Sequence, residues 1–251
     1  MQILGLKYAI SCMLVSERRE LLLERLRREG KLVARDLAAE LGISEDSVRR
    51  DLRDLAAAGL CQRVYGGAVP VSRALADYAT RASVEPESKH LVAARAVELI
   101  EPGHRVILDG GTTTLAVAHA LPLDLQVTVI THSPTIAAAL VPHPTAEILL
   151  LGGRIYKHSA VACGAATVEA AAAVTADLFL LGVTGVHPEH GLTTGDPEEA
   201  AMKRALSARA AETFVLASNE KLGAVSAYKV LELAEVAGIV TESGLLDAAE
   251  L

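Results

Sequence analysis

The 251-residue sequence contains no tryptophan, two phenylalanines and five tyrosines, so aromatic residues amount to only 3% of the chain. Hydrophobic residues nevertheless make up 51% of it, which is enough to form a packed core. That core must consist mostly of alanine, valine and leucine side chains. At this length the chain can form two domains, one small and one of medium size.

Cysteine is equally scarce, and its spacing excludes the usual cysteine-based sites. Cys12, Cys61 and Cys163 are odd in number and far apart, with no paired spacing for a metal or a redox pair. Isolated thiols of this kind are typical of a protein in a reducing compartment, so we expect a cytoplasmic location.

Long hydrophobic runs are missing as well. No apolar segment approaches the roughly 20 residues that a membrane-spanning helix requires. Residues 1–15 are mildly apolar, but Lys7 interrupts them and no signal-peptide layout follows. We therefore expect an N-terminal tail over residues 1–15 and no membrane partner.

A strong positive charge, which is common in DNA-binding domains, is also absent, since the net charge is −7. Residues 16–68 carry 11 Lys and Arg against 10 Asp and Glu, whereas residues 69–251 carry 12 against 21. The acidic character thus belongs to the second part of the chain. The first part, at +1, would have to bind DNA through a few well-placed arginines and through pairing of two copies in a homo-oligomer.

The segment from residue 32 to residue 68 has the pattern of a winged helix-turn-helix. In order, it predicts a short helix, a turn containing glycine, a second helix and a β-hairpin, which is typical of a DNA-binding module. Ser44 is a good N-cap for the second helix, and Ser16 is expected to cap a further helix upstream. The expected elements are helices at residues 17–28, 34–41 and 44–58, a turn at Gly42-Ile43, and a hairpin from Leu60 to Gly67.

The last of these helices, at residues 44–58, has an apolar face and a charged face. With about 100° per residue, Val48, Leu52 and Leu55 form one buried stripe. A recognition helix presents its N-terminal half to base edges, where arginine can bind guanine or phosphate. Charged faces are often merely solvated, but the helices and the wing in register favour DNA. The residues expected at double-stranded DNA are Ser44, Asp46, Ser47, Arg49, Arg50, Arg53 and, in the hairpin, Arg63.

The sequence pattern of residues 89–251 predicts an α/β domain. Beyond a polar linker at residues 72–88, with a short helix around residues 74–80, apolar strand-like runs alternate with alanine-rich helical runs. Continuous apolar runs between helices indicate a parallel sheet covered on both faces, with a ligand at the carboxyl ends of its strands. The expected strands are Arg105–Asp109, Gln126–Thr131, Glu147–Leu151, Leu178–Gly182, Thr213–Ala217 and Gly238–Thr241.

Polar residues gather where these strands end. The first strand leads through residues 109–114, Asp-Gly-Gly-Thr-Thr-Thr, into a helix at residues 115–120. Glycines and hydroxyl groups at a helix N-terminus suit an anion, because the backbone N–H groups and the helix dipole point the same way. Other strands lead to Thr131-His132-Ser133, to Gly152-Gly153-Arg154 and to Lys221. Neither a P-loop nor a Gly-x-Gly-x-x-Gly motif is present, but together these ends favour a pocket for a small phosphorylated or polyhydroxylated molecule.

The recognition-helix sequence Ser44-x-x-Ser-Val-Arg-Arg-Asp-Leu52, followed by Arg63-Val-Tyr-Gly-Gly-Ala68, resembles the DeoR family of bacterial transcriptional regulators. Ser47-Val48 stands where Thr-Ile is commoner in that family, and Tyr65 stands where His is frequent. The resemblance continues, in the family's order, through Lys89, Asp109-x-Gly-Thr-Thr113, Thr131, Leu151-Gly-Gly153, Gly164, Gly182-x-x-Gly185, Gly191, Lys203 and Lys221-x-Gly223. Ser218 and His132 depart from the Asp and Asn that the family generally has there.

The resemblance implies a winged helix-turn-helix at residues 16–71, a linker at 72–88 and an effector-sensing domain at 89–251. That domain is similar in fold to ribose-5-phosphate isomerase and glucosamine-6-phosphate deaminase. Members usually repress sugar-catabolic operons and respond to phosphorylated sugars or related metabolites, so we expect a repressor with a DNA operator, no cofactor and no catalytic residue. The residues expected at the effector are Lys89, Asp109, Gly111, Thr112, Thr113, Thr131, His132, Gly152, Gly153, Lys203 and Lys221.

Two other functions fit parts of the sequence. A phosphosugar isomerase or deaminase with an added DNA-binding domain would need a general base, for which Asp109 is the candidate. An adaptor whose winged module binds protein is compatible with the near-neutral charge of residues 16–68. His187-Pro-Glu-His190 resembles a metal-binding pair, but it lies in a loop with no third ligand evident, so no metal is expected.

Overall fold

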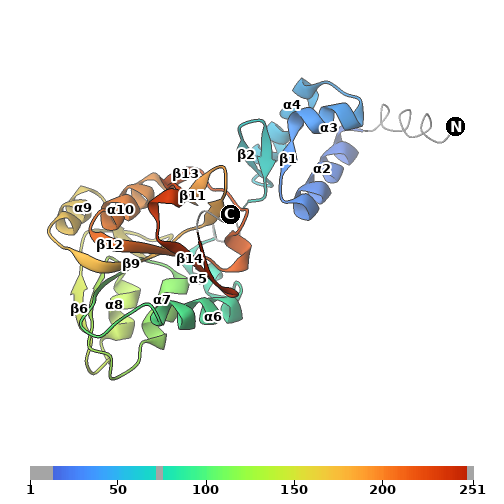
Figure 1. The fold of residues 1–251 in the computed structure, drawn as a ribbon. Helices are drawn as coiled ribbons and strands as arrows, with labels where there is room; N and C mark the ends of the chain where they lie inside the picture. Colours follow the sequence, from blue (N-terminus) through green and yellow to red (C-terminus); the bar gives the residue numbers. More distant parts are fainter. Residues whose placement is uncertain (1–13, 72–75, 248–251) are drawn as a thin grey trace. The chain divides into compact units, whose positions relative to one another are not determined.

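The computed structural model describes residues 14–71 and 76–247, which form two compact units (Figure 1). The N-terminal unit comprises residues up to 71 together with 223–225, and the C-terminal unit comprises the rest. Most of the expected N-terminal tail, residues 1–13, and Cys12 within it lie outside the described residues. No helix in the described part of the chain is long and apolar enough to cross a membrane.

The N-terminal unit is a winged helix-turn-helix, as the sequence predicts. Leu22, Leu26, Leu37, Val48 and Leu52 are buried in a core shared by its three helices. The unit contains helices α2 (Val15–Glu29), α3 (Ala34–Leu41) and α4 (Glu45–Ala57), and strands β1 (Leu32–Val33), β2 (Gln62–Val64) and β3 (Gly67–Val69) in the order β1-β3-β2. The short strand β1 was not predicted.

The start of α2 differs from the prediction. The N-cap residue is Leu14 rather than Ser16, which lies within the first turn. The backbone N–H of Leu14 donates to Oε2 of Glu17 at 3.0 Å, so a carboxylate three residues on occupies the free N–H group at this end. The Glu17 carboxylate thus accepts the N–H of the N-cap residue, and Ser16 is not the N-cap.

The doublet Gly66-Gly67 serves two different needs of the wing. Gly66 has a φ of 80°, a left-handed conformation that glycine adopts without strain in a tight hairpin turn. Gly67 pairs with Val33 of β1, and a Cβ atom placed on it would lie 1.7 Å from the backbone oxygen of Leu32. The third strand of the wing can form only because residue 67 has no side chain.

The C-terminal unit is built on a seven-stranded sheet, and its first six strands along the chain are the six that the sequence predicts, with ends that differ by a few residues. All neighbouring strands are parallel except the edge strand β15, which is antiparallel. The order is β15 (Gly244–Leu246), β14 (Gly238–Thr241), β12 (Ala210–Leu216), β9 (Ala176–Gly182), β4 (Arg105–Leu108), β5 (Thr128–Thr131) and β6 (Glu147–Leu150).

Helices cover both faces of this sheet (Figure 1). On one face Val106 and Leu108 of β4 pack with α6 (Pro86–Val97), α7 (Thr112–Ala120) and α8 (Pro134–Leu140). On the other face Ile107 packs with α9 (Ala165–Ala172) and α10 (Pro197–Ser207). Alternate residues of one strand thus enter two cores, which is why its apolar run is continuous.

Smaller elements complete the C-terminal unit. A second sheet has the order β10 (Gly185–His187), β11 (Gly191–Thr194) and β13 (Tyr228–Leu231), and β7 (Arg154–Tyr156) pairs with β8 (Val161–Cys163). Two 3-10 helices, η2 (Asn219–Lys221) and η3 (Leu233–Glu235), follow β12 and β13.

The segment expected to be a linker is more ordered than predicted. Its short helix is α5 (Tyr78–Ala82), which begins later than expected because the Asp77 carboxylate caps it, accepting the N–H of Thr80 at 2.8 Å. Residues 72–75 lie outside the described part of the chain. Helix α6 already begins at Pro86, so the expected linker end at residue 88 falls within a helix.

Candidate functional site

The recognition helix α4 has a well-formed N-terminus. Oγ of Ser44 accepts the backbone N–H of Ser47 at 3.2 Å and lies 2.9 Å from the Ser47 hydroxyl. Glu45 and Asp46 in the first turn suit the positive end of the helix dipole. Ser44 therefore caps the helix. Ser47 and Asp46 lie in its first turn, at the end that we expect to enter the major groove of DNA.

The expected DNA-facing arginines differ in their partners. Arg49 donates to Glu45 at 2.6 Å, an ion pair within one turn of the helix. Arg50 and Arg53 are exposed, and neither has an ion-pair partner among the described residues. Their positive charges are thus available to an external anion, whereas that of Arg49 is partly neutralised.

Asp51, which lies on the same helix, is buried. It accepts Nε of Arg18 at 2.6 Å and Nε of Arg19 at 3.2 Å, both from α2. Arg19 also pairs with Asp54. The acidic residues of the recognition helix therefore hold α2 in place, and the angular count did not predict this because Asp51 lies beside the apolar stripe.

The wing presents two exposed side chains. Arg63 on β2 is exposed, and Tyr65 at the tip of the hairpin is fully exposed. The sequence analysis placed Arg63 at the DNA but assigned no contact to Tyr65. A fully exposed aromatic ring at a wing tip can reach a neighbouring surface, so Tyr65 is a further candidate contact.

A cavity lies in the C-terminal unit at the carboxyl ends of β4, β9 and β12. These strands are adjacent, and the chain changes direction across the sheet between β4 and β9, where ligands of parallel α/β sheets usually bind. Helix α7 begins there at Gly111, whose φ of 144° turns the strand into the helix. The cavity is lined by Arg81, Val84, Lys89, Gly110 to Thr114, Gly182 to Thr184, Thr194, Glu199, Lys203, Glu220 and Lys221.

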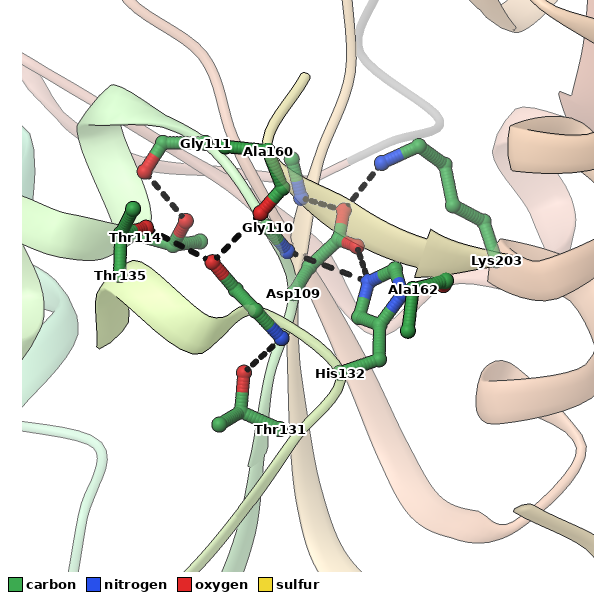
Figure 2. A network of polar contacts seen from close by, with 12 residues as sticks. Asp109, Gly110, Gly111, Thr114, Thr131, His132, Thr135, Ala160, Ala162 and Lys203 are labelled. Carbon is green, nitrogen blue, oxygen red and sulfur yellow. Dashed lines mark hydrogen bonds and ion pairs between the residues drawn. The ribbon is translucent and has the colours of Figure 1, made fainter. Parts of the chain in front are cut away.

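Asp109, which directly precedes the cavity residue Gly110, is the centre of a buried polar network (Figure 2). Its carboxylate accepts Nζ of Lys203 and the backbone N–H of Gly182, the latter at 2.9 Å. Its other oxygen lies 3.0 Å from Nε2 of His132. Burial alone would raise the pKa of Asp109, but Lys203 and His132 outweigh it and lower the pKa to about 2.

His132 faces an oxygen acceptor on each side. Nδ1 lies 2.8 Å from the backbone oxygen of Ala162, and Nε2 lies 3.0 Å from the Asp109 carboxylate (Figure 2). The N–H of Gly110, 3.3 Å from the same Nε2, makes the longest of these contacts. Asp109 and His132 thus support the wall from behind and do not line the cavity.

Two further lysines line the cavity and are buried. Nζ of Lys221 lies 3.2 Å from both Oγ1 of Thr113 and the backbone oxygen of Leu216, and burial lowers the pKa of Lys221 to about 8. Nζ of Lys89 donates to the backbone oxygens of Arg81 and Val84, and burial lowers its pKa as well. Ammonium groups held by neutral acceptors favour the binding of an anion nearby.

The structure brings some of the expected effector residues together and leaves others apart. Lys89, Gly111, Thr112, Thr113, Lys203 and Lys221 line the cavity. Thr131, Gly152 and Gly153 do not, because β5 and the edge strand β6 lie on the far side of β4 from β9 and β12. Oγ1 of Thr131 instead accepts the N–H of Ser133 at 3.1 Å (Figure 2).

Several cavity residues were not expected from the sequence, notably Arg81, Glu199 and Glu220. Arg81 lies in the segment that we took for a linker, where an isolated arginine carries no signal. Glu199 and Glu220 follow short helix starts in which acidic residues are common. Their proximity to the cavity arises only from the tertiary fold.

The sequence His187-Pro-Glu-His190 forms the turn between β10 and β11. Nδ1 of His187 accepts the N–H of Glu189 at 3.1 Å, and the two imidazole rings lie 4.8 Å apart, centre to centre. One possible ligand atom from each of His187, Glu189 and His190 lies within 4.8 Å of the others, so Glu189 is a third potential ligand that the sequence analysis did not see. The contact between the two imidazole rings and the tight turn already account for this proximity without a metal ion.

Two family models match the chain. The DeoR-like helix-turn-helix domain matches residues 18–74, and the DeoR C terminal sensor domain matches residues 84–243.

The chain is also similar to curated regulators and, more remotely, to a solved enzyme. It is 34% identical to the HTH-type transcriptional regulator GlpR of Haloferax volcanii, over 94% of this chain and 92% of that protein. It is 33% identical to the HTH-type transcriptional repressor GlcR of Bacillus subtilis, over 90% and 88%. The ribose 5-phosphate isomerase A of Methanocaldococcus jannaschii aligns with 55% of this chain and 54% of its own, at 19% identity and a TM-score of 0.41.

Proposed function

The chain belongs to the DeoR family of DNA-binding transcriptional regulators, and on that basis we propose that it represses a sugar-catabolic operon and is released by a phosphorylated sugar or a related metabolite. The observation that carries the effector class is the convergence of Arg81, Lys89, Lys203 and Lys221 on one cavity at the start of α7. A regulator of this kind acts where the chromosome is, so we assign it to the cytoplasm.

The DNA contacts in this proposal come from α4 and the wing. Arg50, Arg53 and Arg63 supply exposed charge, Ser47 and Asp46 are short enough to approach base edges, and Ser44 and Arg49 shape the end of the helix. With a charge of only +1 over residues 16–68, one copy would bind weakly. We therefore propose that a homo-oligomer binds repeated or inverted half-sites.

The effector in this proposal binds with its phosphate near the N-terminus of α7. The first N–H groups of that helix have no partner within the helix, and the hydroxyls of Thr112 and Thr113 lie beside them. Lys221 and Lys89 supply positive charge. Asp109 and His132 contribute indirectly by positioning Lys203 and the backbone of Gly110.

Regulation then follows from linkage between the two units, residues 16–71 for DNA and the chain from about residue 76 onward for the effector. A ligand changes DNA affinity only if it binds one conformation of the protein better than another. We propose that the phosphorylated effector favours the conformation with low operator affinity.

We further propose that the C-terminal unit has no isomerase or deaminase activity. Such chemistry needs a general base that can take up a proton near neutral pH. Asp109, the candidate, is fully buried and paired with both Lys203 and His132, and its pKa of about 2 keeps it ionised and weakly basic. Measurable turnover of ribose 5-phosphate or fructose 6-phosphate would contradict this part of the proposal.

Gel-shift titration of the gene's own upstream DNA tests the regulator. Arg50→Ala plus Arg53→Ala should weaken binding about 30-fold or more, since two arginines are lost and each bidentate contact to guanine contributes about 1–3 kcal/mol. Arg95→Ala plus Arg209→Ala, which removes the same charge from the C-terminal unit, should change it less than threefold. Equal binding by the first variant and the parent would indicate an adaptor that contacts protein instead.

Thr113→Val tests the effector site in the same assay with a panel of sugar phosphates. The variant should bind the operator normally but no longer respond to the effector, because the hydroxyl beside Lys221 is lost while the side chain keeps its shape. Thr175→Val, at an exposed position, is the control. Joint loss of both properties would mean that Thr113 is needed for folding.

A further inference from the structure

Arg81 has two donors for which the cavity provides no acceptor. Its Nε and Nη2 atoms are inaccessible to solvent and have no hydrogen-bond partner among the described residues. These two nitrogens form one side of the guanidinium, the side that can bind two oxygens of a phosphate or carboxylate at once. Buried N–H groups are rarely left without an acceptor, so this pair points to a group that the protein itself does not supply.

The nearby acidic residues do not pair with Arg81. Asp109 is engaged by Lys203 and His132, and Glu199, which lies in the cavity wall, forms no ion pair with Arg81 within 4.0 Å. The guanidinium carbon lies 5.9 Å from the centre of the aromatic ring of Tyr78, which is close enough for a cation–π contact. Burial lowers the pKa of Arg81, although Glu199 opposes this, so the free protein holds the charge at a cost.

Glu220 presents the opposite case, a buried acceptor without a donor. Its Oε1 accepts the hydroxyl of Ser218 at 2.7 Å, whereas its Oε2 is inaccessible to solvent and has no hydrogen-bond partner in the part of the chain that the structure describes. Lys221 and Lys89 direct their ammonium groups to Thr113 and to backbone oxygens rather than to this atom. A donor and an acceptor thus remain open in the walls of one cavity without meeting each other.

We propose that Arg81 and Glu220 select the ligand, with Arg81 binding two phosphate oxygens and Oε2 of Glu220 accepting a hydroxyl group of the same molecule. The inference rests on the proposed function and deepens it, because it names the ligand class as a phosphate ester of a polyol. An inorganic phosphate satisfies only Arg81, and a neutral sugar satisfies only Glu220.

The position of Arg81 in the chain links the ligand to the first helix of the C-terminal unit. Arg81 belongs to α5, the first described element after the winged module, and the backbone oxygen of the same residue accepts Lys89 of α6. A phosphate bound to Arg81 therefore restrains α5 and α6 together. Arg81 is thus a binding residue that lies in the first described helix after the winged module.

Thermal unfolding of the full-length protein tests the assignment, with inorganic phosphate, ribose 5-phosphate, fructose 6-phosphate, glycerol 3-phosphate and free ribose as probes. The parent should be stabilised by inorganic phosphate and at lower concentrations by at least one phosphate ester. Arg81→Lys, which keeps the charge but loses the two-oxygen geometry, should need at least tenfold more of each. Arg95→Met, at an exposed arginine of α6, should respond like the parent.

Two more variants separate a binding role from a structural one. Arg81→Met should lose the response to every phosphate, while the ligand-free protein melts about 2–4 °C higher because an unpaired buried charge is gone. Glu220→Gln should keep the response to inorganic phosphate and lose the preference for the ester.

The outcomes distinguish this inference from the proposed function. If Arg81→Lys and Arg81→Met respond to the phosphate ester like the parent, the assignment of Arg81 is wrong, although the regulator still binds such an effector. If Glu220→Gln keeps the parent's preference for the ester, the assignment of Glu220 is wrong. If no phosphate stabilises the parent itself, the phosphorylated effector and both assignments are wrong together.

Discussion

Single residues in the C-terminal unit show how burial and pairing set the charge of a group. Asp109 and Lys221 are both buried, yet the carboxylate stays ionised because Lys203 and His132 contact it, whereas the acceptors of the Lys221 ammonium among the described residues are the neutral oxygens of Thr113 and Leu216. The pKa of Asp109 therefore falls to about 2, and that of Lys221 falls to about 8. Each shift has a consequence that can be measured.

Because of Asp109, the free energy of unfolding should decrease at acidic pH. Its pKa is lower in the folded protein than the usual 3.8, so the folded state favours the ionised form and stability is lost as the pH falls from about 4 to about 2. The corresponding contribution at neutral pH is about 2 kcal/mol. Asp109→Asn should remove this acid dependence and destabilise the protein by about 3–5 kcal/mol, since Lys203 stays buried without its partner.

Chemical denaturation between pH 2 and pH 7 measures this effect, with Asp124→Asn at an exposed position as the control. An Asp109→Asn protein as stable as the parent at neutral pH would show that the buried ion pair contributes nothing.

Because of Lys221, the affinity for the effector should fall as the pH rises above neutral. Burial disfavours its charged form, and Lys89, Arg81 and Lys203 disfavour it further while Glu220 favours it. As the pH rises through about 8 the free protein loses this positive charge, so affinity for a phosphate ester should fall by up to about tenfold per pH unit.

Calorimetric titration from pH 7 to pH 9.5 checks the dependence on Lys221. Lys221→Arg should bind with little change over this range, because arginine keeps its charge. If the parent and Lys221→Arg lose affinity equally at alkaline pH, the group that titrates is not Lys221.

At the scale of elements, the wing shows how close contact between two backbone segments can require a glycine at one position. β1 of only two residues pairs with β3, and this pairing passes directly over Gly67. The sequence analysis used the glycine doublet to predict a hairpin turn, which the structure has. It did not predict β1, because two residues are too short for any periodicity.

Gly67→Ala should therefore disrupt the wing more than Gly66→Ala does. Alanine at 66 suffers only the strain of a positive φ, about 1 kcal/mol, whereas alanine at 67 collides with the backbone of Leu32. Hydrogen exchange of the full-length protein should show lost protection at residues 32–33 and 62–69 in Gly67→Ala. Unchanged protection there would mean that β1 can shift to accommodate a methyl group.

The prediction of elements from the sequence succeeded where periodicity is strong. Helix α3 has the expected bounds, and the six predicted strands are all among the seven strands of the large sheet. It failed at the starts of α2 and α5, where the carboxylates of Glu17 and Asp77 accept free backbone N–H groups. Which nearby side chain accepts a free N–H group depends on local geometry, and a sequence pattern does not contain that geometry.

At the scale of the whole molecule, the charges are divided between a near-neutral winged unit and an acidic C-terminal unit. DNA affinity depends on how many phosphates a complex neutralises, so a single winged unit offers little. Arg50, Arg53 and Arg63 are few contacts for one half-site, and two copies would double them.

Native mass spectrometry with the gene's upstream DNA should therefore detect at least two chains per bound fragment. Raising the salt from 50 to 200 mM should weaken binding by about 10³-fold or more if six or more phosphates are contacted in total. One chain per fragment with nanomolar affinity would contradict the need for an oligomer.

The sequence alone determined the two-part organisation, the winged module and its exposed arginines, and the parallel α/β class, because each depends on local periodicity, caps and glycine turns. The tertiary structure alone decided which strand ends meet. The order β12-β9-β4-β5-β6 results from long-range packing, so Gly111, Thr113 and Lys221 share a cavity, while Gly152 and Gly153 follow an edge strand away from it. Arg81 and Glu220 came from the fold alone, since an unpaired buried atom exists only once its surroundings are in place.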